Sequence, residues 1–150
     1  MTFSLRHAAL GLALALASGL AAAQATPAGL WKTVDDSTKK EKSLVRIVES
    51  GGVYTGRVEK VIDPDSPKDA VCKDCTDDRK DKPVVGMTII RNMKASGDKD
   101  VFEGGDILDP NNGKVYSAKL TLVDGGKKLD VRGYIGMPML GRTQTWQRVE

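Results

Sequence analysis

The chain has 150 residues, of which 40% are apolar and 29% are charged. A chain of this size supports one modest hydrophobic core, which excludes a second domain. The formal net charge of +3 is too small to indicate nucleic acid or an anionic membrane surface as a partner.

The first 23 residues differ in composition from the rest. They contain 16 of the apolar residues, and 8–20 consists almost entirely of Ala and Leu after Arg6 and His7. A basic start, a short apolar run and small residues at 21–23 are typical of a cleaved secretory signal peptide. A transmembrane helix needs about 20 apolar residues, more than this run provides. We therefore predict a signal peptide over 1–23 and one exported domain over 24–150, periplasmic or secreted in a bacterium.

After residue 23 the apolar residues follow the alternation of β-strands. No window has apolar residues at helical spacing over three turns. The alternation is clearest in 114–123 and 128–135, which are separated by the tight-turn sequence Asp124-Gly125-Gly126 and therefore predict a hairpin. In chain order, the same criteria predict eight strands, at 29–34, 43–49, 53–62, 84–94, 100–108, 114–123, 128–135 and 141–149.

Eight short strands without a covering helix must protect their edges in another way, and closure of the sheet does so. We therefore predict an all-β fold, a single small antiparallel up-and-down barrel of about eight strands. The interior of such a barrel holds side chains or one small ligand. An open β-sandwich is the alternative. Glycines inside the predicted strands indicate sharp bends of the sheet; they are at 56, 86, 104, 105 and 133.

The sequence Gly29-Leu30-Trp31 begins the first predicted strand. It resembles the G-x-W signature of the calycin barrels, which include the lipocalins. The resemblance implies that Trp31 plugs one end of the barrel and packs against an arginine of the last strand, Arg148 or Arg142. Such a cation–π contact contributes about 0.5 to 2 kcal/mol. The alternative is a tryptophan that only enters the core.

A second resemblance covers nearly all of 24–150. The segments that carry it are Gly29-Leu30-Trp31-Lys32, the Cys72-Lys73-Asp74-Cys75 region with Asp78-Arg79-Lys80, Pro83 and Gly86-Met87, the stretch 104–116, Arg132-Gly133-Tyr134, and 141–146. Through these segments the sequence is similar to domain of unknown function family 2147. The resemblance implies a small exported β-rich bacterial domain, and it implies no activity.

Cys72 and Cys75 lie in 63–83, the one long loop that the sequence predicts. Two cysteines in an oxidising compartment usually form a disulfide. Because the closed loop is so short, this disulfide should stabilise the fold by only about 2 kcal/mol and be easily reduced. A redox-active dithiol and half of a metal site are the alternatives, although 76–83 does not predict the helix that depresses a thiol pKa. We expect the rest of this loop to be solvated.

Catalytic and metal signatures are missing from 24–150. The single histidine is His7, so its removal with the signal peptide excludes Ser-His-Asp, Cys-His and His-metal sites. Zinc would need carboxylates beside the two cysteines, and the aspartates of 63–82 lack EF-hand spacing for calcium. Gly125-Gly126-Lys127-Lys128 lacks the helix N-terminus of a phosphate site. The chain has enough Asp and Glu residues for a catalytic carboxylate pair, but most of them alternate with lysines or lie in turns. We therefore predict no catalytic, cofactor or metal-binding residues.

An apolar segment, Met137-Pro138-Met139-Leu140, directly precedes the last predicted strand. It could border the barrel mouth, dock a partner or fold inward.

We predict a non-enzymatic, monomeric barrel that binds a small apolar molecule, without nucleic acid or membrane insertion. The alternatives are an envelope protein-interaction module with a solid core and a thiol–disulfide redox protein acting through Cys72 and Cys75. With only 44 apolar residues in 24–150, any cavity should be small or partly polar.

Overall fold

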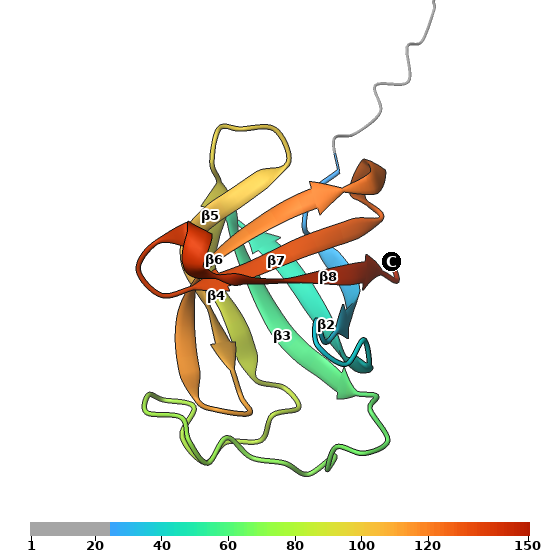
Figure 1. The fold of residues 1–150 in the computed structure, drawn as a ribbon, viewed down its shortest axis with the longest axis vertical. Helices are drawn as coiled ribbons and strands as arrows, with labels where there is room; N and C mark the ends of the chain where they lie inside the picture. The colour runs from blue at the N-terminus through green and yellow to red at the C-terminus, as the bar shows by residue number, and fades with distance from the viewer. Residues whose placement is uncertain (1–24) are drawn as a thin grey trace, which may run out of the picture.

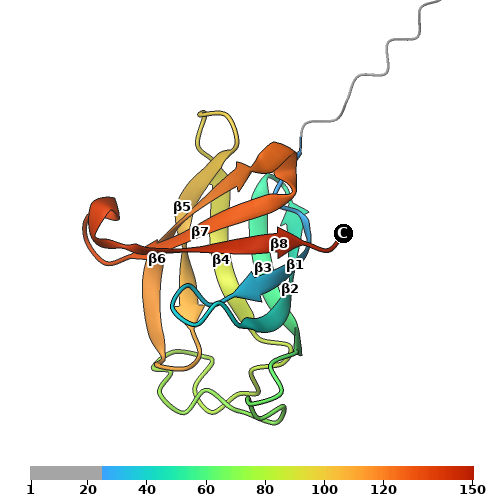
Figure 2. The same ribbon diagram turned by 45° about the vertical axis from the view of Figure 1, so that its right-hand side comes forward.

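The computed structural model describes residues 25–150, so the predicted signal peptide over 1–23 lies outside the described residues. Eight strands form one closed antiparallel barrel in which every strand pairs with its neighbours in the sequence and β8 pairs with β1 (Figures 1 and 2). The prediction of an all-β up-and-down barrel is therefore confirmed. The open sandwich is wrong, because the last strand returns to the first.

The strands are β1 (Gly29–Val34), β2 (Glu41–Ser50), β3 (Val53–Val61), β4 (Thr88–Ala95), β5 (Val101–Asp109), β6 (Lys114–Val123), β7 (Lys128–Tyr134) and β8 (Arg142–Arg148). Two single-turn 3-10 helices, η1 (Asp124–Gly126) and η2 (Pro138–Leu140), lie in the last two connections. The strand bounds agree closely with the sequence-based ones except at the start of β4, for which the sequence predicts residue 84. Gly86 has a φ of +90°, and the Met87 N–H donates to Val84 O at 3.1 Å, so 84–87 form a turn before β4 begins.

The inner face of the barrel holds the core. Alternate residues of β6 and β7 are buried, as the sequence alternation predicts: Ala118, Leu120, Leu122, Leu129 and Val131. Opposite faces of the same strands carry Lys119 and Asp130, which are partly exposed. This alternation is what a sheet with one dry and one wet face requires.

One end of the barrel is closed by Trp31 and Arg148. The Trp31 ring is fully buried, and its indole N–H donates to Pro27 O at 2.7 Å. The Arg148 guanidinium lies 4.3 Å from the centre of that ring. Its N–H groups donate to the carbonyl oxygens of Gly126, Ala28 and Thr26 at 2.6 to 2.8 Å. Arg148, and not Arg142, therefore occupies the position against Trp31.

The connection 62–87 crosses the other end of the barrel, where Figure 1 draws it at the bottom, from green to yellow-green. Cys72 and Cys75 form a disulfide with an S–S distance of 2.00 Å. The expectation that the rest of this loop is solvated is wrong at Asp63 and Arg79, which are buried. Arg79 donates to Asp77 and, through Nη1, to Thr88 O at 2.9 Å. Ion pairs and backbone hydrogen bonds hold this polar segment in place. The segment has no apolar pattern, so the sequence does not reveal that part of it is buried.

Candidate functional site

A cavity of about 490 Å³ enters the barrel at the end opposite Trp31. Residues from the β1–β2, β3–β4, β5–β6 and β7–β8 connections line it, and in an up-and-down barrel these four connections share one end. Its volume falls within the range of about 300 to 1,000 Å³ that small-molecule sites occupy. The cavity is partly polar, in agreement with the expectation from the small number of apolar residues.

One wall of the cavity is apolar. It combines side chains from β3, β4, β5, β7 and β8: Val58, Val61, Ile89, Ile107, Leu108, Val131 and Trp146. Most of these are buried by the barrel itself. A ligand that covers them replaces water against apolar surface, which is favourable by about 25 cal/mol per Å².

Polar side chains from β1 and β2 line the opposite wall. Thr33 and Ser43 share a hydrogen bond of 2.9 Å between their hydroxyls. Lys42 forms an ion pair with the buried carboxylate of Asp63, which also accepts from Ser66 Oγ at 2.9 Å. The Lys42 hydrogen bond is the main cause that lowers the pKa of Asp63 to about 2. These groups form hydrogen bonds with one another, and the charges of Lys42 and Asp63 cancel.

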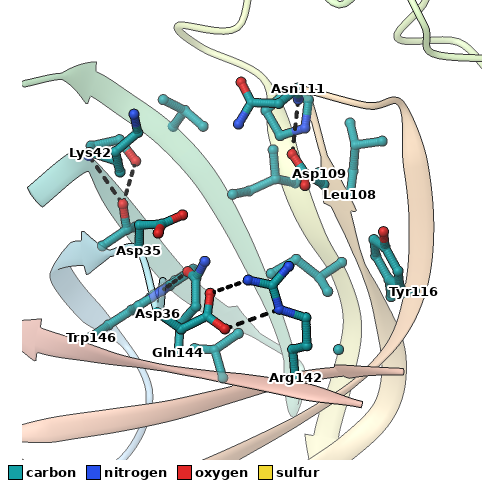
Figure 3. Close-up of a pocket in the computed structure, with 18 of the residues that line it drawn as sticks. Asp35, Asp36, Lys42, Leu108, Asp109, Asn111, Tyr116, Arg142, Gln144 and Trp146 are labelled. Carbon is teal, nitrogen blue, oxygen red and sulfur yellow. Dashed lines mark hydrogen bonds and ion pairs between the residues drawn. The ribbon is translucent and has the colours of Figure 1, made fainter. Parts of the chain in front are cut away.

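An ion pair spans the mouth of the cavity between the β1–β2 turn and the start of the last strand. Arg142 Nε and Nη2 donate to the two carboxylate oxygens of Asp36 at 3.0 and 2.8 Å, and Nη2 also donates to Ser37 Oγ at 2.9 Å (Figure 3). The pair lies beyond the point where β1 and β8 pair through their backbones, at Trp31 with Arg148 and Lys32 with Gln147. The Asp36 hydrogen bond is the main cause of the raised pKa of Arg142.

The inner face of β8 adds a second polar group deeper in the cavity. Arg142, Gln144 and Trp146 all face inward, two residues apart, and all line the cavity. Trp146 Nε1 donates to Gln144 Oε1 at 3.0 Å. Sequence reasoning missed Gln144 and Asp36 as site residues. The alternation within 141–149 carries a signal for the inward position of Gln144, but no pattern marks Asp36, which lies in a turn.

The predicted segment Met137–Leu140 lies at this mouth. Arg132 donates to Pro138 O at 2.7 Å and to Met139 O at 3.2 Å, which fixes the backbone of η2. Leu140 lines the cavity, whereas Met137 and Met139 do not. The large apolar side chains of this region are exposed: Ile135 65%, Met137 56%, Met139 70% and Leu140 73%.

The predicted disulfide does not line the cavity. Asp74, between Cys72 and Cys75, packs against Gly113 of the β5–β6 turn so closely that a Cβ at Gly113 would overlap with Asp74 O. The turn from Asp109 to Asn111 beside it borders the mouth. Cys72 is 0% and Cys75 is 2% exposed, so an external thiolate has no path to the sulfurs in the folded protein.

Neither a metal centre nor a membrane-spanning helix is found within residues 25–150. In this part of the chain no three or more His, Cys, Asp or Glu side chains are placed to hold one metal ion. Over the same residues, no helix has the length and apolar character that crossing a bilayer requires.

Comparison with known proteins yields a family and a fold. A family model described as "Uncharacterized protein conserved in bacteria (DUF2147)" matches residues 29–148. A solved structure from Helicobacter pylori, protein HP1028, described as belonging to the lipocalin family, is similar with a TM-score of 0.72. The two sequences are 20% identical, and the match covers 84% of each chain, so the likeness concerns the fold alone. No curated protein sequence matches the chain significantly.

Proposed function

The chain belongs to the DUF2147 family of bacterial proteins, and we propose that it is an exported lipocalin-like barrel that binds a small, largely apolar molecule without catalysing its conversion. The observation that carries this proposal is the cavity of about 490 Å³, which is closed at the Trp31 end and opens at the other. A barrel with a solid core, as an interaction module would have, needs no such space. The apolar wall favours an apolar ligand body.

The acidic residues of the cavity support a binding role over catalysis. A general acid or base near neutral pH needs a pKa close to that pH. The Thr38 backbone N–H is the main cause that lowers the pKa of Asp35, and both oxygens of Asp36 are bound to Arg142. Asp109 Oδ1 accepts from the Asn111 N–H at 2.9 Å within its own turn. These carboxylates stabilise turns and an ion pair.

Export is part of the proposal. Residues 1–23 have the composition of a cleaved signal peptide. The Cys72–Cys75 disulfide fits a protein of the periplasm or the exterior, where disulfides persist. N-terminal sequencing of the protein recovered from the periplasm or medium tests this part: a chain that begins at Gln24 supports it, and a retained Met1 contradicts it.

The binding proposal is tested with N-phenyl-1-naphthylamine, a neutral apolar probe whose fluorescence rises in apolar sites. Gly133 lines the cavity, and a Cβ there would make an ordinary contact with its nearest atom, Tyr116 Cβ, at 3.4 Å, so a side chain at this position occupies cavity space. We expect the wild type to bind the probe and Gly133→Leu to bind it at least tenfold more weakly. Val48→Leu, on the exposed outer face of β2, is the matched control and should bind as the wild type does. A wild type that binds no probe, and shows no bound mass in native mass spectrometry, contradicts the proposal.

A second candidate function rests on the exposed apolar segment 135–140. Four large apolar side chains project to solvent beside the mouth while Arg132 fixes the backbone of η2. Clustered exposed apolar groups of this kind mark protein interaction sites. The candidate is docking to another protein of the bacterial envelope.

Cross-linking in the envelope, followed by pull-down, tests this second candidate. Met137→Asp should lose a partner that the wild type and the control Val48→Asp both retain, with probe binding unchanged. Retention of every captured protein by Met137→Asp contradicts the candidate and leaves the cavity proposal intact.

A further inference from the structure

The orientation of Gln144 leaves an amide donor inside the cavity. An indole N–H can only donate, so the Gln144 atom 3.0 Å from Trp146 Nε1 must be the amide oxygen. The Gln144 NH₂ group therefore points away from Trp146, and no acceptor for it is found among residues 25–150. Within the same residues, Asp106 Oδ1 is the one buried side-chain atom without a partner, so the NH₂ group is accessible from the cavity.

Two more donors line the same cavity. Arg142 uses Nε and Nη2 for Asp36 and Ser37, and within residues 25–150 its Nη1 has no partner. Tyr116 Oη accepts from Asn112 Nδ2 at 3.2 Å, so its own proton is free to donate. Gly133 pairs with Arg142 across β7 and β8, and its Cα faces Tyr116. In Figure 3, Gln144 and Arg142 project from β8, and Tyr116 lies on the other side of the drawn space.

The charges around these donors favour a neutral ligand. Asp36 offsets the charge of Arg142, and Asp63 offsets that of Lys42. The carboxylates of Asp35 and Asp109 remain at the mouth and oppose an anionic group. An ammonium group would be attracted to the mouth, but it has no acceptor to offer the Gln144 amide.

Resting on the proposed function, we propose that the natural ligand is a neutral molecule with an apolar body and a carbonyl-type oxygen, which accepts a hydrogen bond from Gln144 Nε2. The apolar body lies against Val58, Val131 and Trp146. The oxygen lies on the β8 side of the cavity, and the ketone, ester and amide classes all provide it.

Two fluorescent probes distinguish a hydrogen bond from Gln144 to a carbonyl oxygen from apolar binding in the cavity in general. Prodan is a naphthalene with a ketone whose emission moves to the red when the carbonyl accepts a hydrogen bond, whereas N-phenyl-1-naphthylamine has no carbonyl. We expect Gln144→Leu to weaken prodan about three- to tenfold, as loss of one hydrogen bond does, and to move its bound emission to the blue. The affinity for N-phenyl-1-naphthylamine should change by less than about twofold, because this probe offers the amide no carbonyl oxygen.

Two further variants make the result specific. Gln147→Leu removes an amide from the outer face of β8 and should leave both probes unaffected. Gln144→Glu keeps an acceptor for Trp146 Nε1 while it removes the donor, so it should lose prodan even if Gln144→Leu folds poorly. Equal loss of both probes in Gln144→Leu and an unchanged prodan affinity in Gln144→Glu would each overturn the inference. If neither probe binds the wild type, it is the proposed function that fails.

The class of ligand is tested by competition. Undecan-2-one, undecanoate and undecylamine have apolar chains of similar length with a neutral, an anionic and a cationic polar end. Each competes with bound N-phenyl-1-naphthylamine below its aggregation concentration. The ketone should displace the probe at the lowest concentration. Displacement at lower concentration by undecanoate or by undecylamine overturns the assignment to neutral carbonyl compounds.

Discussion

At the scale of single residues, Arg148 does more than stack on an aromatic ring. Its guanidinium stacks on the Trp31 ring and at the same time satisfies three backbone carbonyls from the chain before β1 and from the β6–β7 turn. The charge is therefore paired with peptide dipoles and with the face of an aromatic ring, and no carboxylate of residues 25–150 forms an ion pair with it. This explains how a partly buried arginine closes the barrel end.

Replacement of Arg148 by methionine should destabilise the fold strongly. The change removes the cation–π contact, about 0.5 to 2 kcal/mol, and charge-assisted hydrogen bonds of about 1.5 to 3 kcal/mol each, part of which water restores. We expect the free energy of unfolding in urea to fall by about 3 kcal/mol, the sum of these losses after that restoration.

Arg46→Met is the matched control. Arg46 forms exposed ion pairs with Glu59 and Glu150 on the outer surface, so its loss should cost less than about 1 kcal/mol. Equal effects of the two variants would contradict this account.

The loop contributes a pH dependence through Asp63. Its pKa in the folded protein is about 2, below the ordinary 3.8, mainly because Lys42 donates to its carboxylate. A lowered folded-state pKa stabilises the fold above the ordinary pKa, and this contribution is lost as the pH falls from about 4 to 2. Thermal unfolding should therefore show a drop in Tm over this interval that is smaller in Asp63→Asn. An identical drop in wild type and variant would assign the acid sensitivity to other groups, Asp77 first, since hydrogen bonds from Arg79 lower its pKa to about 2 as well.

At the scale of elements, the connection 62–87 differs most from its sequence-based description. Its many charged residues indicate a solvated loop, yet Asp63, Arg79 and the disulfide are buried. The sequence could not reveal this, because a charge that pairs with a partner 21 residues away looks the same as one that faces water. The start of β4 is predicted too early for the opposite reason: Val84 and Val85 have strand-forming side chains, but they lie in a turn that the Met87 N–H closes on Val84 O.

The burial of Cys72 and Cys75 changes the expectation that their disulfide is easily reduced. Thiol–disulfide exchange needs access of a thiolate to a sulfur, and both residues are covered in the fold. We expect dithiothreitol under native conditions to leave the disulfide intact over minutes, and to reduce it rapidly in urea. Alkylation followed by mass measurement counts the free thiols. Rapid alkylation of both cysteines without urea would show that the loop opens readily, and would restore the redox hypothesis.

At the scale of the whole molecule, the strand alternation and turn residues are sufficient to predict a closed eight-stranded barrel. The cavity is predictable only as small or partly polar. Its key pair, Asp36 and Arg142, is separated by 106 positions and meets only because β8 returns to β1. Local patterns carry no information about such closure contacts. The G-x-W motif predicts the contact between Trp31 and an arginine of the last strand, but no motif predicts the polar groups of the cavity.

A cavity that binds a ligand couples binding to the stability of the entire barrel. A molecule that binds only the folded state stabilises it by RT ln(1 + [L]/Kd), which is about 2.7 kcal/mol at a concentration of about 100 Kd. Urea unfolding of the wild type with N-phenyl-1-naphthylamine at that concentration should show this increase. Gly133→Leu, which binds at least tenfold more weakly, should show an increase of at most about 1.4 kcal/mol. Val48→Leu should keep the full increase. If the probe stabilises Gly133→Leu as much as the wild type, the probe binds outside the barrel, and the cavity is not the binding site.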